Sequence, residues 1–75
     1  MIRRRWDYER ARLAFEATGI THKRAAALLG IAERSIRYYL SGERVPTVDV
    51  AVDWAHLCDV SLDQLLSWER NGQAT

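Results

Sequence analysis

Two short helical segments on either side of a tight bend that begins with a glycine constrain the fold of this chain more than any other feature of its sequence. The segments lie in the stretch THKRAAALLGIAERSIRYYLSG, which covers residues 21–42. Thr21 can cap the first segment, because its hydroxyl can accept a backbone N–H of the first helical turn. Gly30 and Gly42 follow the two segments, and glycine readily adopts the positive φ that ends a helix. The stretch therefore predicts two short helices that cross at a tight bend.

Three more helices are predicted around this pair from the spacing of apolar residues and from capping residues. Asp7 can cap the first of them, Thr47 can cap another, and residues 61–64 (SLDQ) form a capping box. The five predicted helices cover residues 8–18, 22–29, 33–41, 48–58 and 62–69. Trp54 lies on the apolar face of the fourth helix, so we expect it to be buried.

The stretch over residues 21–42 resembles the helix-turn-helix of the phage Cro/cI repressor type, the Xre-like family. The similarity continues in residues 42–47, in Trp54-Ala55 and in residues 60–66, so that it covers most of the chain. It implies an all-α, five-helix, lambda-repressor-like DNA-binding domain, in which the second and third helices form the helix-turn-helix.

Three positions depart from the family pattern. Ala32 stands where a serine or threonine N-cap is usual, and the missing hydroxyl costs about 1 kcal/mol. Leu28 stands where a polar residue is usual, which fits either a second buried face or a contact with another subunit. Asp59 stands where the family prefers glycine, so the end of the fourth helix is less well defined by the sequence.

The resemblance implies that the third helix reads DNA bases from its exposed face. Glu33, Arg34 and Tyr38 match the base-reading positions, and the fork of Arg34 can bond both O6 and N7 of guanine. Glu33 could accept a hydrogen bond from cytosine or orient Arg34, and Tyr38 could contact a thymine methyl group or a phosphate. Arg37 is expected to contact phosphate or solvent. The residues expected at the DNA backbone are His22, Lys23, Arg24, Arg37 and Arg44.

The net charge of +1 conceals two halves of opposite sign. Residues 1–45 hold ten Lys and Arg against five Asp and Glu, whereas residues 46–75 hold one Arg against five Asp and Glu. The basic half contains the helix-turn-helix, which favours a polyanionic partner for that half. The alternative is a pair of solvated faces that attract each other within the fold.

A homodimer is expected, because one motif of this size reads too little sequence to select a site among many competitors. The predicted interface lies on the fifth helix and the turn after it, at Leu62, Leu65, Leu66 and Trp68. The alternative is that these leucines close the small core and that Trp68 covers the first helix. With double-stranded DNA as its partner, the chain is predicted to be a repressor that binds an inverted-repeat operator as a homodimer.

The remaining sequence predicts a single domain over residues 1–75, with residues 1–6 as a flexible basic arm and residues 71–75 as a flexible tail. The arm could touch phosphate or a minor groove. The single cysteine, Cys58, excludes an intrachain disulfide and fits a reducing cytoplasm. Cys58 and His56 lack the further ligands of a structural zinc site, so no metal is expected. No run of about 20 apolar residues is present, so no membrane span is expected.

No cofactor and no enzymatic activity are predicted, since the sequence has no glycine-rich phosphate loop, no HExxH motif and no nucleophile elbow. A narrower resemblance, to small repressors encoded beside anti-CRISPR genes, points to a phage or mobile element. Two other functions stay open: an antitoxin-like protein-interaction module, and a Fis-like architectural DNA binder.

Overall fold

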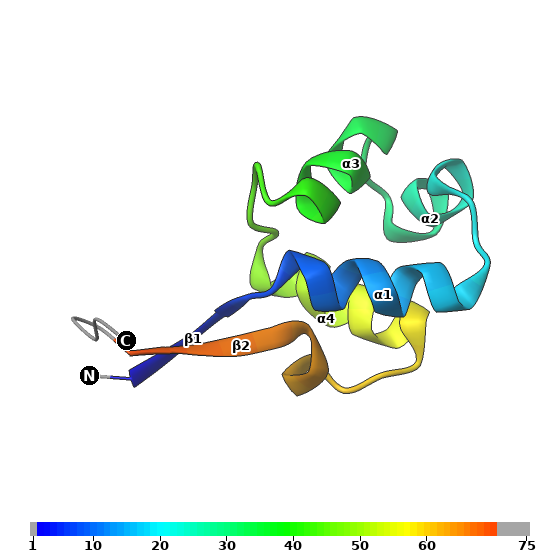
Figure 1. The fold of residues 1–75 in the computed structure, drawn as a ribbon. Helices are drawn as coiled ribbons and strands as arrows, with labels where there is room; N and C mark the ends of the chain where they lie inside the picture. Colours follow the sequence, from blue (N-terminus) through cyan, green and yellow to red (C-terminus); the bar gives the residue numbers. More distant parts are fainter. Residues whose placement is uncertain (1, 71–75) are drawn as a thin grey trace.

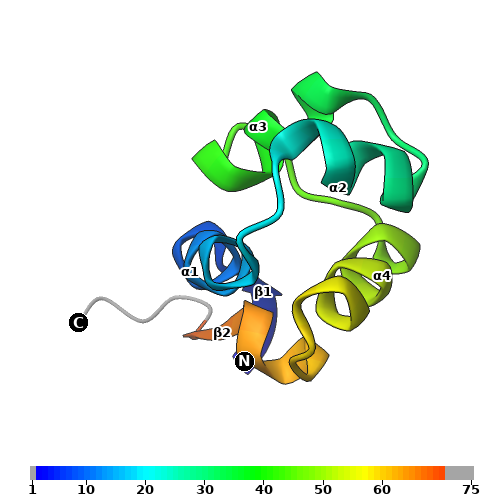
Figure 2. The same cartoon turned by 90° about the vertical axis from the view of Figure 1, so that its right-hand side faces the viewer.

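Four α-helices, one 3-10 turn and a two-stranded ribbon make up residues 2–70, the part of the chain that the computed structural model describes. In chain order they are β1 (Ile2–Trp6), α1 (Tyr8–Thr18), α2 (His22–Leu29), α3 (Glu33–Ser41), α4 (Val48–Cys58), the 3-10 turn η1 (Leu62–Leu65) and β2 (Leu66–Arg70). α2 and α3 lie together on one side of α1, and the ribbon projects from the N-terminal end of α1 (Figure 1). A view along α1 shows α1 and α4 side by side beneath the α2–α3 pair (Figure 2).

Four of the five predicted helices form with the predicted bounds, and three of them have a side-chain N-cap. Asp7 accepts hydrogen bonds from the backbone N–H groups of Glu9 and Arg10, at 3.1 and 3.2 Å. Thr21 and Thr47 cap α2 and α4 through their hydroxyls, whereas Ala32 gives α3 no side-chain cap. α4 ends at Asp59, which adopts a left-handed φ of 57° in the place of a glycine. Aspartate tolerates this conformation better than most residues.

The bend between α2 and α3 depends on Gly30, whose φ of 70° ends α2. The N–H of Ile31 then donates to the carbonyl of Ala26 at 3.0 Å, which closes the helix end. Ala25 and Ala26 are buried, and their small side chains let α3 pack closely on α2.

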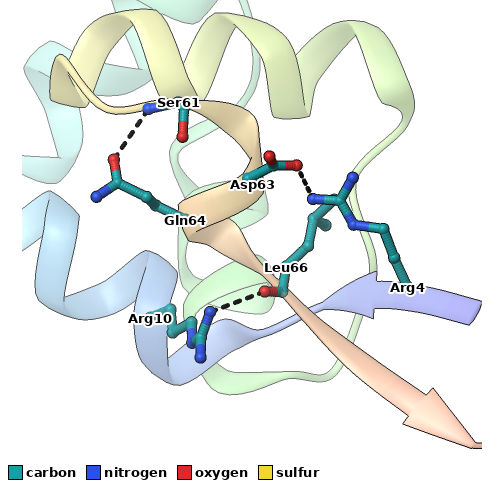
Figure 3. Close-up of polar contacts among 6 residues, drawn as sticks. All are labelled: Arg4, Arg10, Ser61, Asp63, Gln64 and Leu66. Atoms are coloured by element: carbon teal, nitrogen blue, oxygen red, sulfur yellow. Dashed lines mark hydrogen bonds and ion pairs between the residues drawn. The ribbon is translucent and has the colours of Figure 1, made fainter.

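The prediction of a fifth helix over residues 62–69 is wrong. One 3-10 turn forms over Leu62–Leu65, and the chain then continues as an extended strand. The capping interaction is present, since the side chain of Gln64 accepts from the N–H of Ser61 at 3.0 Å (Figure 3). The next two carbonyls, however, accept hydrogen bonds from residues at the start of α1. The carbonyl of Leu65 accepts from the N–H of Asp7 at 2.9 Å. The carbonyl of Leu66 accepts from the guanidinium of Arg10 at 3.0 Å (Figure 3). Contacts to α1 and β1 therefore replace further helical turns.

Residues 2–6, predicted to lie in a flexible arm, form β1 instead. β1 pairs antiparallel with β2, so that Arg4 lies opposite Trp68 and Trp6 opposite Leu66. The guanidinium of Arg4 lies 5.3 Å from the ring centre of Trp68 and also pairs with the carboxylate of Asp63 (Figure 3). Cross-strand pairs of this kind stabilise a two-stranded ribbon that would be marginal alone. The predicted tail, residues 71–75, lies outside the described residues.

Trp54 is fully buried, as predicted, and organises the core. The rings of Trp6, Phe15 and Tyr39 surround it, with centroids 5.6, 5.7 and 6.4 Å away. These rings come from β1, α1 and α3, so a single α4 side chain holds the other elements at fixed distances. Aromatic pairs in such edge-on and tilted arrangements add to the free energy gained from burial.

Candidate nucleic-acid interface

The outer face of α3 is polar and accessible, while its inner face anchors the helix. Ile36 and Leu40 are buried in the core. On the opposite side Glu33, Arg34, Arg37 and Ser41 are exposed, and Tyr38 is half buried. Helical spacing thus separates the two faces as the sequence predicted.

Glu33 and Arg37 form an ion pair one helical turn apart. The guanidinium Nη2 of Arg37 lies 3.2 Å from Oε2 of Glu33, and both side chains are largely exposed. Arg34 makes no hydrogen bond or ion pair with any of the described residues. Of the two roles predicted for Glu33, orienting Arg34 is therefore not seen in this structure, and Glu33 orients Arg37 instead.

Arg44 folds back over Tyr38 at the C-terminal end of α3. Its guanidinium lies 5.0 Å from the centre of the Tyr38 ring, and its backbone N–H donates to the Tyr38 carbonyl at 3.3 Å. The two residues form one unit in which a fixed cation covers an aromatic face. The loop after α3 thereby carries a positive charge at the edge of the exposed face.

The start of α2 provides three other residues that the sequence predicted at the DNA backbone. His22 is half buried, with its ring 5.5 Å from that of Phe15, while Lys23 and Arg24 are exposed. The N-terminal end of a helix also carries unpaired backbone N–H groups and a partial positive charge, which favour anions. These residues and those of α3 come from the two adjacent helices of the pair.

Two residues that the sequence analysis left without a role hold α3 in place. The indole Nε1 of Trp6 donates to the Tyr39 carbonyl at 3.0 Å. Tyr8 packs over Gly42, where a β-carbon would lie 2.7 Å from the Tyr8 ring. The sequence does contain a signal that Trp6 packs on α1. An apolar residue just before the N-cap of a helix, here Asp7, commonly packs against the fourth residue of that helix, which is the buried Ala11.

The predicted dimer-interface residues have different environments. Leu65 is fully buried in the core of its own chain, so it is not accessible to a second subunit in this structure. Leu62 and Leu66 are half buried. The side chain of Trp68 is 69% exposed and stacks on Arg4 rather than on α1.

Leu28, whose apolar character departs from the family pattern, is 53% exposed. It therefore belongs to no second buried face of the chain.

Cys58 is half buried, and burial raises the pKa of its thiol to about 11. Among residues 2–70 no group of three or more His, Cys, Asp or Glu side chains could hold a metal ion. Over the same residues no helix is both long and apolar enough to cross a bilayer.

A helix pair crossing at a tight bend, with an exposed polar face on its second helix and cations at the start of its first, defines a helix-turn-helix domain. The family described as Helix-turn-helix matches residues 12–65, more than half of the chain. The chain therefore belongs to this Xre/Cro-like helix-turn-helix family of DNA-binding regulators, as the sequence predicted. No curated protein matches the chain. The narrower resemblance to repressors encoded beside anti-CRISPR genes stays a prediction.

Proposed function

We propose that this protein is a sequence-specific transcriptional repressor that places α3 in the major groove of its operator. The observation that carries the proposal is the free guanidinium of Arg34 on the exposed face of a helix that is anchored by Ile36 and Leu40. An unpaired guanidinium at this position can donate hydrogen bonds to both O6 and N7 of guanine. The free-energy cost is small, because no bond to a partner within the protein has to be broken first. Occupancy of an operator by a small domain is enough to exclude polymerase.

Other residues near Arg34 are proposed for the remaining contacts with the DNA bases and backbone. Glu33 can accept from a cytosine amino group, although it must then share its carboxylate with Arg37. Tyr38, covered by Arg44, presents a ring edge suited to a thymine methyl group or a phosphate. His22, Lys23, Arg24, Arg37 and Arg44 are proposed as backbone contacts, which fix the register of α3 without reading sequence.

Selection of bound sites from a random DNA pool tests this function. Wild-type protein should enrich one motif, and Arg34→Ala should bind that motif more weakly by about 1–3 kcal/mol and lose preference at one base pair. Arg34→Lys keeps the charge but not the fork, so it should also lose that preference. Lys23→Ala is the matched control, because it should weaken binding without changing the selected motif. Enrichment of no motif would overturn the proposal, and tight binding to all sequences would favour an architectural role.

We further propose that the repressor acts as a homodimer through the ribbon. Arg4, Trp6, Leu66 and Trp68 share one face of the ribbon by register. This face continues into a hollow of about 540 Å³ whose apolar lining includes Val45, Pro46, Val48 and Leu62. Val45 and Val48 are 68% and 74% exposed beside it. Because Val45 and Pro46 directly follow α3, two copies joined here would hold their reading helices at a fixed spacing on an inverted repeat.

Sedimentation and gel shifts with half-sites test the dimer. Trp68→Ala should shift the free protein toward monomer and weaken binding to the full repeat, while binding to one half-site stays the same. Leu13→Ala is the matched control, since Leu13 is 67% exposed on α1, away from this surface. A wild-type protein that binds one half-site as tightly as the repeat, one copy per duplex, would contradict the dimer.

A further inference from the structure

Another hollow, of about 330 Å³, lies between α1, the start of α2 and the second half of α3. Its floor is apolar and consists of Phe15 and Leu40, which are 3% and 8% exposed. Its rim is polar and combines three helices: Arg12 and Glu16 come from α1, His22 from α2, and Arg37 and Ser41 from α3.

Arg12 makes no polar contact within the described chain. It is exposed, and among residues 2–70 its guanidinium makes no hydrogen bond, ion pair or ring contact. Glu16 lies one helical turn further along α1, but the two side chains are not within ion-pair distance. Arg10, by contrast, donates to the carbonyl of Leu66 at 3.0 Å and lies 3.6 Å from the carboxylate of Asp7. Arg12 is thus a cation available to an external anion.

The other groups of the rim are held in place by contacts within the chain. The ring of His22 packs on Phe15, with centroids 5.5 Å apart, and Glu33 holds the guanidinium of Arg37. The hydroxyl of Ser41 donates to the Tyr38 carbonyl at 3.2 Å. Glu33 thus offsets the charge of Arg37, and Glu16 is the one carboxylate among the described residues that line the hollow. Arg12 is the cation of this rim that has no ion-pair partner among residues 2–70, and its unpaired charge favours a small anion over a cation or an apolar group.

We infer that the hollow receives one phosphate of the DNA backbone and that Arg12 is a phosphate-binding residue supplied by α1. The inference rests on the proposed function: with α3 in the major groove, the backbone at the groove edge runs past the start of α2. The hollow lies where the start of α2 meets the side of α3, so a phosphate at that edge comes within reach of Arg12. A phosphodiester presents two free oxygens, which match the guanidinium fork. Glu16 opposes the phosphate and tunes the strength of the contact.

The test compares charge changes of opposite sign on α1, measured on a duplex with one half-site. Arg12→Gln should weaken binding about tenfold at low salt and reduce the slope of log K against log salt by about one unit. Glu16→Gln should strengthen binding, because it removes a negative charge from the hollow. Glu9→Gln is the matched control: it removes the same charge from the first turn of the same helix, and its effect should be smaller than that of Glu16→Gln.

Neutral methylphosphonate groups placed one at a time along the half-site locate the phosphate. One position should weaken wild-type binding and have no effect on Arg12→Gln, because the variant has already lost that contact. An unchanged salt slope for Arg12→Gln, beside normal site selection by the wild type, would overturn this inference while leaving the proposed function intact. Inorganic phosphate added to the free protein distinguishes a phosphate of DNA from a free phosphate ion as the ligand of the hollow. If phosphate saturates the hollow while Arg12→Gln has no effect on DNA binding, the ligand is a free anion and the inference is overturned.

Discussion

The indole Nε1 of Trp6 donates a hydrogen bond of 3.0 Å to the backbone carbonyl of Tyr39, and this bond connects the N-terminal strand to α3. The same indole packs edge-on against Trp54, with an angle of 85° between the rings. Trp6 thus contacts the centre of the core and the C-terminal half of α3 at once. Since Trp6 pairs with Leu66 in the ribbon, the ribbon and α3 share one anchoring side chain.

Trp6→Phe should keep most of the packing but remove this hydrogen bond. The lost bond and the smaller ring should lower the free energy of unfolding by about 1–2 kcal/mol. Denaturant unfolding followed by circular dichroism measures the change. Trp68→Phe is the control, because Trp68 is an exposed indole, and it should leave the midpoint nearly unchanged. Equal losses in the two variants would contradict the anchoring role of Trp6.

The helices were predictable because the signals that set their ends are local. Thr21, Gly30 and Gly42 act within a few residues of themselves, and α2 and α3 have the predicted bounds. The polar outer face of α3 followed from helical spacing around Ile36 in the same way. These parts of the candidate site therefore follow from short-range capping and periodicity, without knowledge of the tertiary contacts.

The ribbon could not be predicted, because its partners lie at opposite ends of the chain. Residues 61–64 carry a local helix-start signal, and it does produce one turn. From Leu66 onward the chain forms a strand that pairs with β1, and local propensity does not predict this tertiary contact. The same holds for the Trp6–Tyr39 bond and for Arg44 over Tyr38, whereas the Glu33–Arg37 pair could have been expected from its spacing of four residues.

Gly42→Ala should destabilise the protein more than Gly30→Ala. Both glycines have a left-handed φ, 85° and 70°, so either substitution introduces backbone strain of about 1 kcal/mol. At Gly42 the new β-carbon would also lie 2.7 Å from the ring of Tyr8, whereas at Gly30 nothing lies within 4 Å. Thermal unfolding of the two variants compares these costs.

A double variant separates the clash from the strain. Tyr8→Ala combined with Gly42→Ala should be less destabilising than the sum of the two single changes, because the ring that the new methyl meets is gone. Additive losses would mean that the Tyr8 ring moves aside freely and does not constrain the end of α3.

Cys58 should react slowly in the folded protein. Burial raises the pKa of its thiol from 9.0 to about 11, so at pH 8 the thiolate fraction falls about a hundredfold relative to an unperturbed thiol. Labelling with iodoacetamide, with the urea-unfolded chain as reference, measures the difference. Because the folded pKa lies above the unfolded one, this thiol also favours unfolding as pH rises from about 9 to 11. Cys58→Ser should show a shallower loss of stability in that window, and equal labelling rates for folded and unfolded protein would contradict the prediction.

Lys23→Ala should weaken DNA binding by a similar factor on all sequences, and Arg44→Ala should weaken it on all sequences as well. A cation that contacts phosphate releases about one counterion on binding, so each variant should reduce the slope of log K against log salt by roughly one unit. The two sites differ in one respect: Arg44 is stacked on Tyr38, whereas Lys23 lies exposed at the start of α2. Arg44→Ala should therefore also change base preference slightly through Tyr38, and Lys23→Ala should not. Salt titrations of binding to the selected site and to an unrelated duplex measure both effects, and an unaltered slope would remove the residue concerned from the backbone contacts.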